Sequence, residues 1–407
     1  MKFIDNVDIS KYRNFESNHK KSHFLQSYEW GQFCKRAKKQ IPCYVGMEDD
    51  NGNLVATCLI LLKKTPFGFS YGYAPRGFVL DYGNKDLINK FTNYLKKYMK
   101  DNKIIYIKFD PDIKYQTINE EGLKIDGENN YELYNYMLSL GYKHTGFYKL
   151  YEGNQPRYTF RIDLKKPWEE IEAKFNKSFM KSVKRSYTYN LVVDNDVKVD
   201  DFYRLIQSNS SKDAFDPHSL EYYKIFSEEM SKDNNMKYFN ISIRPKELLD
   251  NISKEINELN KELEVNKKKE ADIKNKIARL EKEIDVFSKI DKDEVCVCSL
   301  ICTYTKTHAW SLYIGSDDLA NFTFAVTRSY YEAIKDAYDK GYEFFDLFGT
   351  PGDPNTKYKN LAKLHDFKRK FGDEYIEFIG EFDLVNNKLL YKMLPTMLRI
   401  YRKLRRK

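Results

Sequence analysis

No uninterrupted apolar stretch in the sequence reaches the roughly 18 residues that a membrane-spanning helix needs. The N-terminal stretch, MKFIDNVDISKYRNF, also lacks the apolar core of a secretory signal peptide. We therefore expect neither an integral membrane protein nor a secreted one, and the sequence predicts a cytoplasmic protein.

Motifs for metals and cofactors are missing as well. The six cysteines include no C-x-x-C pair, and the six histidines show no metal-ligand spacing. There is no glycine-rich phosphate loop, and the turn that binds the pyrophosphate of acetyl-CoA is absent before the helix expected near Thr327. We expect no metal and no cofactor, and cysteines that pack in the core.

Aromatic residues, by contrast, are abundant. They make up 15% of the 407 residues, which argues for packed cores despite a charged fraction of 32%. This length predicts two or three domains. The formal net charge is +9, and the segment from Lys388 to Lys407 alone holds eight cations and no acid. The excess of positive charge is therefore a property of the tail.

Two stretches share one order of predicted elements. Residues 53–64 and 67–82 have strand patterns, residues 85–102 have helical spacing, and residues 103–111 have a strand pattern again. The same order returns in residues 294–307, 308–316, 327–341 and 342–349. This repeated β-β-α-β unit predicts a duplicated α/β or α+β core with a parallel or mixed sheet in each copy.

Two helical patterns lie between or inside these units. Residues 168–187, WEEIEAKFNKSFMKSVKRSY, combine an apolar face with a basic one, which we interpret first as solvated surface over a packed face. Residues 246–290 place apolar residues, from Leu249 onward, at steps of three and four on either side of VNKKKEAD, which predicts an antiparallel helical hairpin with a coiled-coil seam. Its cations and acids balance, so we favour a structural or docking arm over direct RNA contact.

The C-terminal segment, LLYKMLPTMLRIYRKLRRK, is a basic amphipathic pattern. Leu394, Met397, Leu398, Tyr401 and Leu404 fall on one side of a helix and cations on the other. Such a helix can lie on an anionic membrane surface, or it can pack on the core with a basic end. The pattern leaves both interpretations open.

Seven segments together resemble the Fem/MurM family of peptidoglycan aminoacyltransferases. They are FLQSYEWGQFCK (24–35), YAPRGFVLDY (73–82), IKFDP (107–111), RYTFRIDL (157–164), LYIGSDD (312–318), YEFFDLFG (342–349) and FKRKFG (367–372). The resemblance implies two tandem acetyltransferase-like domains with an inserted helical arm. We place the first domain at 1–155, the second at 156–245 and 291–385, the arm at 246–290 and the tail at 386–407.

The resemblance also implies a reaction and its partners. The family uses an aminoacyl-tRNA to add an amino acid to the side-chain amine of the third residue of the peptidoglycan stem peptide. The acceptor is lipid II or UDP-MurNAc-pentapeptide, and the basic tail favours the membrane-anchored form. Attack of an amine on an activated ester needs positioned substrates, a proton acceptor and a stabilised oxyanion, but no metal.

Candidate catalytic residues follow from the matching motifs. Phe367 and Lys368 match the family's Phe-Lys pair, whose lysine stabilises the tetrahedral transition state. Asp110, at the end of a strand and before Pro111, matches an active-site aspartate that orients the attacking ammonium or takes its proton. The alternatives are a solvated or phosphate-binding Lys368 and an Asp110 that only caps a turn.

The expected diphosphate clamp departs from the family pattern at two positions. Cys34 stands where a lysine is usual, and His218 stands where an arginine is usual, so Lys35, Arg36 and Arg76 become the candidate cations. Three further residues are candidates for the acceptor site: His218 itself, Tyr222 and Tyr313. For tRNA the candidate cations are Arg369, Lys370, Lys267, Lys268 and Lys269.

Two other functions remain compatible with these patterns. One is a noncatalytic protein of the same fold that binds RNA or a membrane surface, as the altered clamp would allow. The other is an acetyl-CoA-dependent N-acetyltransferase. The sequence alone does not identify the amino acid transferred.

Overall fold

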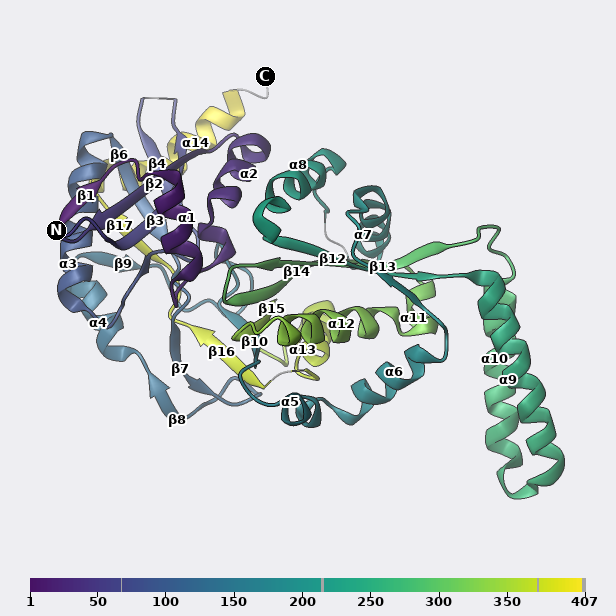
Figure 1. The fold of residues 1–407 in the computed structure, drawn as a ribbon. Helices are drawn as coiled ribbons and strands as arrows, with labels where there is room; N and C mark the ends of the chain where they lie inside the picture. The colour runs from purple at the N-terminus through teal and green to yellow at the C-terminus, as the bar shows by residue number, and fades with distance from the viewer. Residues whose placement is uncertain (67, 214–215, 372, 405–407) are drawn as a thin grey trace.

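The computed structural model describes residues 1–66, 68–213, 216–371 and 373–404, and the side chains of 211–213, 268 and 401–404 lie outside the described set. Figure 1 shows two sheets side by side with helices on their faces, and a helical hairpin that projects from one end. Within the described ranges, no helix has the length and apolarity to cross a membrane.

The first sheet has eight strands, and most of it comes from the N-terminal half of the chain. Strands β4 and β6 run parallel, and the other strand pairs of this sheet in the described ranges are antiparallel. In spatial order the strands are β1 (Lys2–Ile4), β2 (Ile41–Glu48), β3 (Leu54–Lys64), β4 (Ser70–Ala74), β6 (Ile104–Phe109), β17 (Phe382–Val385) and β9 (Tyr142–His144), with β5 (Val79–Leu80) beside β3.

The second sheet has nine strands, and only β14 and β15 run parallel in it. In spatial order they are β11 (Val192–Asp194), β12 (Met236–Ile243), β13 (Val295–Tyr304), β14 (His308–Ser316), β15 (Phe344–Thr350), β10 (Tyr158–Asp163), β16 (Glu374–Phe378), β7 (Lys114–Ile118) and β8 (Lys124–Asn129). Fourteen α-helices accompany the sheets in the described ranges: α1 (Ile9–Asn18), α2 (Tyr28–Lys38), α3 (Lys85–Asp101), α4 (Tyr131–Ser139), α5 (Trp168–Lys174), α6 (Lys177–Tyr187), α7 (Val199–Asp213), α8 (Leu220–Met230), α9 (Pro245–Val265), α10 (Glu270–Phe287), α11 (Leu319–Thr323), α12 (Ala325–Asp339), α13 (Lys359–Lys368) and α14 (Lys388–Leu404).

The predicted repeat is present in both sheets. Strands β3 and β4, helix α3 and strand β6 form one β-β-α-β unit, and β13, β14, α12 and β15 form the other. In each unit the helix connects two parallel strands, because a parallel connection must cross the face of the sheet. Helix α3 starts at an Asn84 side chain that accepts the Leu87 N–H, and it buries Leu87, Phe91 and Leu95 against the sheet. The two-sheet α/β fold is therefore confirmed.

The sheets exchange strands across the predicted boundary at residue 155. Strands β7 and β8 precede the boundary but pair through β16 with the second sheet. Strand β17 follows it and pairs with β6 and β9 in the first sheet. The chain thus passes repeatedly between the two sheets, and the domain limits given above stay a prediction.

Helices α9 and α10 pack against each other as an antiparallel pair between β12 and β13. The seam between them is apolar, and its buried residues are Leu248, Ile252, Leu259, Ile273, Leu280 and Phe287. Leu249, where the expected pattern begins, is partly buried against this cluster, and the neighbouring Leu248 is fully buried. The hairpin is present where the pattern places it, and the coiled-coil geometry of its seam stays a prediction.

Helix α14 packs on the first sheet beside β6. Leu394 is buried there, and the Tyr391 hydroxyl donates to Asp383 Oδ2 at 2.7 Å. The described part of the predicted apolar side thus faces the core, while Tyr401 and Leu404 have side chains outside the described set. A different row, Leu389, Met393 and Ile400, is exposed.

Candidate active site

Lys368 is the last residue of α13 and is buried, with 7% of its surface exposed. Its Nζ donates to the carbonyl oxygens of Phe348 at 3.0 Å and of Gly349 at 2.8 Å, both at the end of β15. An ammonium has three N–H donors, so one remains for another acceptor. Burial lowers the pKa of Lys368 from 10.5 to about 7, although the Asp346 carboxylate opposes this shift.

The backbone at the end of β15 is shaped to present these two carbonyls. Phe348 has a positive φ of 58°, and its N–H donates to Asp346 Oδ1 at 2.7 Å, which holds the bend. Gly349 must be glycine, because a Cβ there would lie 2.2 Å from the Pro156 ring. The Gly349 carbonyl also accepts the Tyr151 hydroxyl at 3.0 Å. Lys368 therefore sits in a preformed cradle.

Asp110 is also buried, at the end of β6 in the first sheet. Its Oδ2 accepts the Tyr73 hydroxyl and its Oδ1 accepts the Arg76 backbone N–H, both at 2.7 Å. Burial raises the pKa of this carboxyl to about 6; the Arg76 charge lowers it and the Glu381 carboxylate raises it. A carboxylate with this pKa can take a proton near neutral pH.

Contacts connect the two candidate catalytic residues across the sheets. The Arg76 guanidinium donates from Nη2 to the Pro156 carbonyl at 2.7 Å and lies 4.2 Å from the Phe378 ring centroid. Pro156 in turn packs on Gly349, whose carbonyl accepts Lys368. Arg76 thus links Asp110, which accepts its backbone N–H, to Pro156, which packs next to the cradle of Lys368. The guanidinium of Arg76 already has partners within the protein.

Arg161 and two aspartates hold the end of β15, where Lys368 is bound. Arg161 pairs with Asp112 at 2.7 Å and with Asp346 at 2.8 Å, and its guanidinium lies 3.9 Å from the Phe344 ring centroid. These contacts hold the Asp112 pKa well below its usual range against the opposing effect of burial. Asp346, which bends the chain at Phe348, is thereby fixed from a second side.

A second cluster brings together three of the predicted acceptor-site residues. The His218 ring stacks on Tyr222 with centroids 3.8 Å apart, and the Tyr222 and Tyr313 hydroxyls are 3.1 Å apart. Lys38, which sequence reasoning missed, places its Nζ 4.8 Å from the Trp30 ring centroid and 5.8 Å from that of Tyr222. Desolvation of the ammonium lowers the Lys38 pKa.

A sequence signal for Lys38 exists. Trp30, Cys34 and Lys38 are spaced by four residues on α2, so they share one face of that helix. Cys34 is fully buried, and its pKa is raised to about 11 by burial, so it acts as a packed thiol. Lys38 lies one helical turn after this position, at which the family resemblance implies a cation.

The other predicted cations on α2 lie elsewhere. Arg36 pairs with Glu229 at 2.6 Å and with Glu228 at 2.7 Å. Lys35 is exposed and lines a separate pocket of about 540 Å³ with Tyr28 and Tyr44. The structure does not bring either residue to the His218 cluster.

The predicted RNA-binding cations are also separated. Arg369 pairs with Asp366 at 3.3 Å, whereas Lys370 lies two residues after Lys368, in the turn where its N–H donates to the Phe367 carbonyl at 3.2 Å. Lys267 and Lys269 are exposed at the tip of the hairpin, which Figure 1 shows projecting away from the sheets; the Lys268 side chain lies outside the described residues. Phe367 packs against Phe371 and Tyr330, with centroids 5.0 and 5.3 Å apart, so its contacts are structural.

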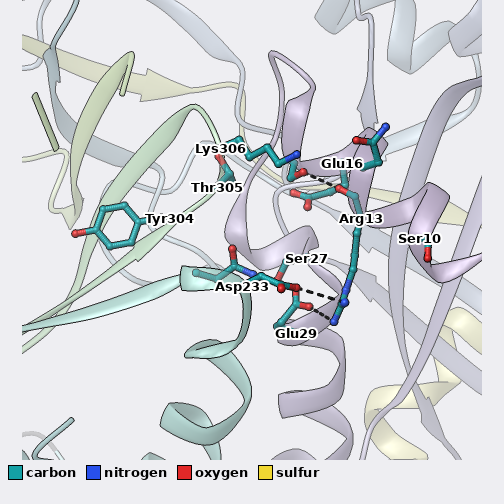
Figure 2. Close-up of a pocket in the computed structure, with 12 residues that line it drawn as sticks. Ser10, Arg13, Glu16, Ser27, Glu29, Asp233, Tyr304, Thr305 and Lys306 are labelled. Atoms are coloured by element: carbon teal, nitrogen blue, oxygen red, sulfur yellow. Dashed lines mark hydrogen bonds and ion pairs between the residues drawn. The ribbon is translucent and has the colours of Figure 1, made fainter. Parts of the chain in front are cut away.

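A pocket of about 410 Å³ lies between α1, α2 and the second sheet, and sequence reasoning missed it (Figure 2). Arg13 bridges Glu29 at 2.5 Å and Asp233 at 3.3 Å on its wall. The buried Glu16 carboxyl accepts the His23 N–H at 3.3 Å, and burial raises its pKa to about 8. Neither Lys368 nor Asp110 lines this pocket. Among the described residues, no group of three or more His, Cys, Asp or Glu side chains is arranged to hold a metal ion.

Comparison with known proteins identifies the family. A model of the FemAB family matches residues 7–399. The chain belongs to the FemAB family. The family resemblance of the seven sequence segments is therefore confirmed, and the FemAB match extends from α1 through most of α14.

Similar proteins include two named lipid II:glycine glycyltransferase. The protein of Staphylococcus haemolyticus (strain JCSC1435) is 27% identical over 410 residues, which cover 96% of this FemAB-family chain and 94% of that protein. The protein of Staphylococcus aureus (strain MSSA476) is 26% identical over 428 residues, which cover 97% of each chain. The crystal structure of FemX covers 97% of this chain and 99% of its own, with a TM-score of 0.78 and 23% identity, so the two proteins share a fold.

Proposed function

We propose that this protein transfers an amino acid from an aminoacyl-tRNA to the side-chain amine of the third residue of the peptidoglycan stem peptide, forming a branch or bridge. The similar proteins named lipid II:glycine glycyltransferase support a lipid II acceptor over the soluble UDP-MurNAc-pentapeptide. The observation that carries the proposal is the buried Lys368, which has one N–H left after its two backbone contacts.

In the proposed reaction the acceptor amine attacks the ester carbonyl of the charged tRNA. A C–N bond forms, the C–O bond to the ribose breaks, and the ribose oxygen leaves with a proton. Asp110 takes the proton that the attacking ammonium must lose, and the free N–H of Lys368 donates to the carbonyl oxygen as it becomes an oxyanion. One such donor typically lowers the activation barrier by about 2.7 to 4 kcal/mol.

For the acceptor we propose the cluster around His218. Its two tyrosine hydroxyls and the Lys38 ammonium offer the donors that a diphosphate and sugar require. The Lys38 ammonium lies over aromatic rings and has no carboxylate partner among the described residues, so an incoming phosphate would be its counter-ion. This assigns to Lys38 the role that Lys35 and Arg36 were predicted to share.

The exposed row on α14 supports a peripheral membrane contact. Leu389, Met393 and Ile400 lie on one face, next to the cations of the same helix. Replacing these three residues by serine should weaken binding to vesicles of anionic phospholipid, most clearly at low salt. Unchanged binding to vesicles of the same composition would contradict this part of the proposal.

The transfer reaction is tested by incubating the purified protein with charged tRNA and lipid II and measuring the product. Wild type should form the amide, and Lys368→Ala should form it on the order of 100 to 1,000 times more slowly. Equal product from both proteins would remove Lys368 from catalysis. Absence of product from wild type with every charged tRNA would reject the function.

A further inference from the structure

Helix α6 carries three lysines without a carboxylate partner in the part of the chain that the structure describes. From Lys174 to Val193 the sequence holds five cations and no acid. Lys174 pairs with Asp373, and Arg185 pairs with Glu255 at 3.1 Å. The remaining three cations are exposed and form no ion pair with a residue that the structure describes: Lys177, Lys181 and Lys184. Their spacing of four and three residues places them on one face of the helix.

A second basic row lies on α13 and the turn after it. Lys359 and Lys363 are one helical turn apart and exposed, and Lys370 follows the helix. No carboxylate within the described ranges pairs with any of the three, whereas Arg369 already pairs with Asp366. We call these six lysines, on α6 and α13, the α6–α13 basic surface.

The two rows meet next to Lys368. The Asn176 N–H, at the start of α6, donates to the Lys370 carbonyl at 2.9 Å. The Phe179 ring packs on Phe371 with centroids 4.3 Å apart, which fixes α6 against the turn that follows α13. Figure 1 shows α6 between α5 and the helical hairpin, below α12. The start of the α6 row and the end of the α13 row are therefore joined within two residues of Lys368 in the sequence.

Exposed aromatic rings accompany the cations. Tyr187, the last residue of α6, and Tyr358, which precedes α13, are each 52% exposed. The Arg328 guanidinium lies 3.6 Å from the Tyr187 ring centroid, and the Lys357 ammonium lies 5.3 Å from that of Tyr358. Cations that track a phosphate backbone, combined with rings on which bases stack, are the features that bind single-stranded nucleic acid ends.

We propose that the α6–α13 basic surface binds the acceptor stem and the 3′ end of RNA and directs that end to Lys368. This inference rests on the proposed function, because it assigns the surface that receives the RNA donor. It also moves RNA binding away from the hairpin tip. Where the hairpin faces the end of α6, near Thr188, it presents three glutamates and two lysines, so this part of the hairpin has no excess of positive charge to attract phosphate.

A lipid surface fits this face less well. The apolar side chains Phe179 and Val183 of α6 are buried, so the helix offers no aliphatic row to insert among acyl chains. Such a row exists on α14 instead, at Leu389 and Met393. The cations of α14 therefore lie beside exposed aliphatic side chains, whereas those of the α6–α13 basic surface do not.

The test compares two triple variants that lose the same charge. Lys177→Gln, Lys181→Gln and Lys184→Gln remove the α6 row. Lys97→Gln, Lys100→Gln and Lys103→Gln, on and just after α3, remove three exposed lysines that also have no carboxylate partner in the described ranges. Binding of an uncharged, fluorescently labelled acceptor-stem minihelix is measured by anisotropy across a salt series, and thermal melting checks that both variants fold.

Each lost phosphate contact makes the slope of log K against log salt less steep by about 0.9. The slope of the α6 variant should therefore be less steep than that of wild type by about 2.7, and the slope of the α3 variant should be unchanged. At 0.1 M salt the corresponding loss of affinity is about 500-fold. In the transfer assay the defect should appear in KM for the charged RNA and be overcome by saturating RNA, with KM for the acceptor unchanged.

Three outcomes overturn the inference: an unchanged slope in the α6 variant, an equal loss in the α3 variant, or a loss of binding to anionic vesicles with RNA binding intact. The last would assign the surface to lipid. If the minihelix binds as expected but wild type forms no amide from any charged RNA, the surface stands and the proposed transfer fails. If wild type forms the amide and the α6 variant behaves like wild type, only the surface fails.

Discussion

Replacing Lys368 by arginine and by methionine separates the possible roles of its side chain. Burial places the pKa of Lys368 at about 7, so its protonated fraction falls about tenfold for each pH unit above that value. Arginine stays protonated throughout, because its pKa exceeds about 12. If the ammonium stabilises the oxyanion, kcat/KM of wild type divided by that of Lys368→Arg should fall about tenfold per pH unit between roughly pH 7.5 and 9.5.

The ratio cancels the ionisation of the attacking amine, which is common to both proteins. Lys368→Met should retain the fold and lose about 100- to 1,000-fold in rate, equivalent to about 2.7 to 4 kcal/mol. A ratio that rises with pH would assign Lys368 as a base instead. A constant ratio, or a methionine variant within tenfold of wild type, would refute the role altogether.

A stability measurement checks the pKa itself. The unfolded chain binds more protons than the folded one between about pH 7 and 10.5, because the folded pKa of Lys368 is the lower of the two. The free energy of unfolding should therefore rise with pH across that window. Lys368→Met should lack this rise, and chemical denaturation of both proteins at several pH values measures the difference.

Three further predictions concern other ionisable groups. Asp110→Asn should lower kcat on the order of 100-fold at neutral pH and remove an acidic limb near pH 6 from the rate profile, since its pKa is about 6; an unchanged profile would contradict a catalytic carboxylate. Glu16 has a folded pKa of about 8, above its unfolded 4.5, so stability should fall as pH rises between these values. Glu16→Gln should gain on the order of 4 kcal/mol over wild type at pH 8 relative to pH 5 in denaturant titrations. Lys38→Met should raise KM for lipid II about tenfold and leave kcat unchanged, whereas Lys97→Met should change neither.

The duplicated core could be predicted from sequence because its signals are local. The strand patterns of β3 and β13 and the helical spacing of α3 and α12 are each contained within a single element. The order of elements then restricts the topology, since a helix between two strands implies a parallel pair. The hairpin of α9 and α10 was predictable for the same reason.

The exchange of β7, β8 and β17 between the sheets could not be predicted, because strand pairing over such distances leaves no local pattern. Strand β8 is exposed along its whole length, so it has no alternation to detect. The burial of a single polar residue also depends on elements that are distant in the sequence, so a local pattern does not predict it. Glu16 and Glu29 occupy helical positions that resemble solvated ones, yet each is 2% exposed in the pocket of Figure 2.

For the candidate site, sequence motifs identified residues but not their partners. Lys368 and Asp110 were predicted as candidates. The structure places Asp110 directly after β6 of the first sheet and Lys368 at the end of α13, against β15 of the second sheet, with Arg76, Pro156 and Gly349 between them. The guanidinium of Arg76 could not be assigned, because its contact with the Pro156 carbonyl depends on how the two sheets meet.

The measurement that tests the central claim most directly is tandem mass spectrometry of the reaction product. Purified protein is incubated with lipid II and a panel of charged tRNAs, and the muropeptide is fragmented. The proposed function predicts a single added amino acid in amide linkage to the side-chain nitrogen of the third stem residue, with some charged tRNAs and not with uncharged ones. An unmodified muropeptide throughout, or an amino acid attached at any other nitrogen, would contradict it.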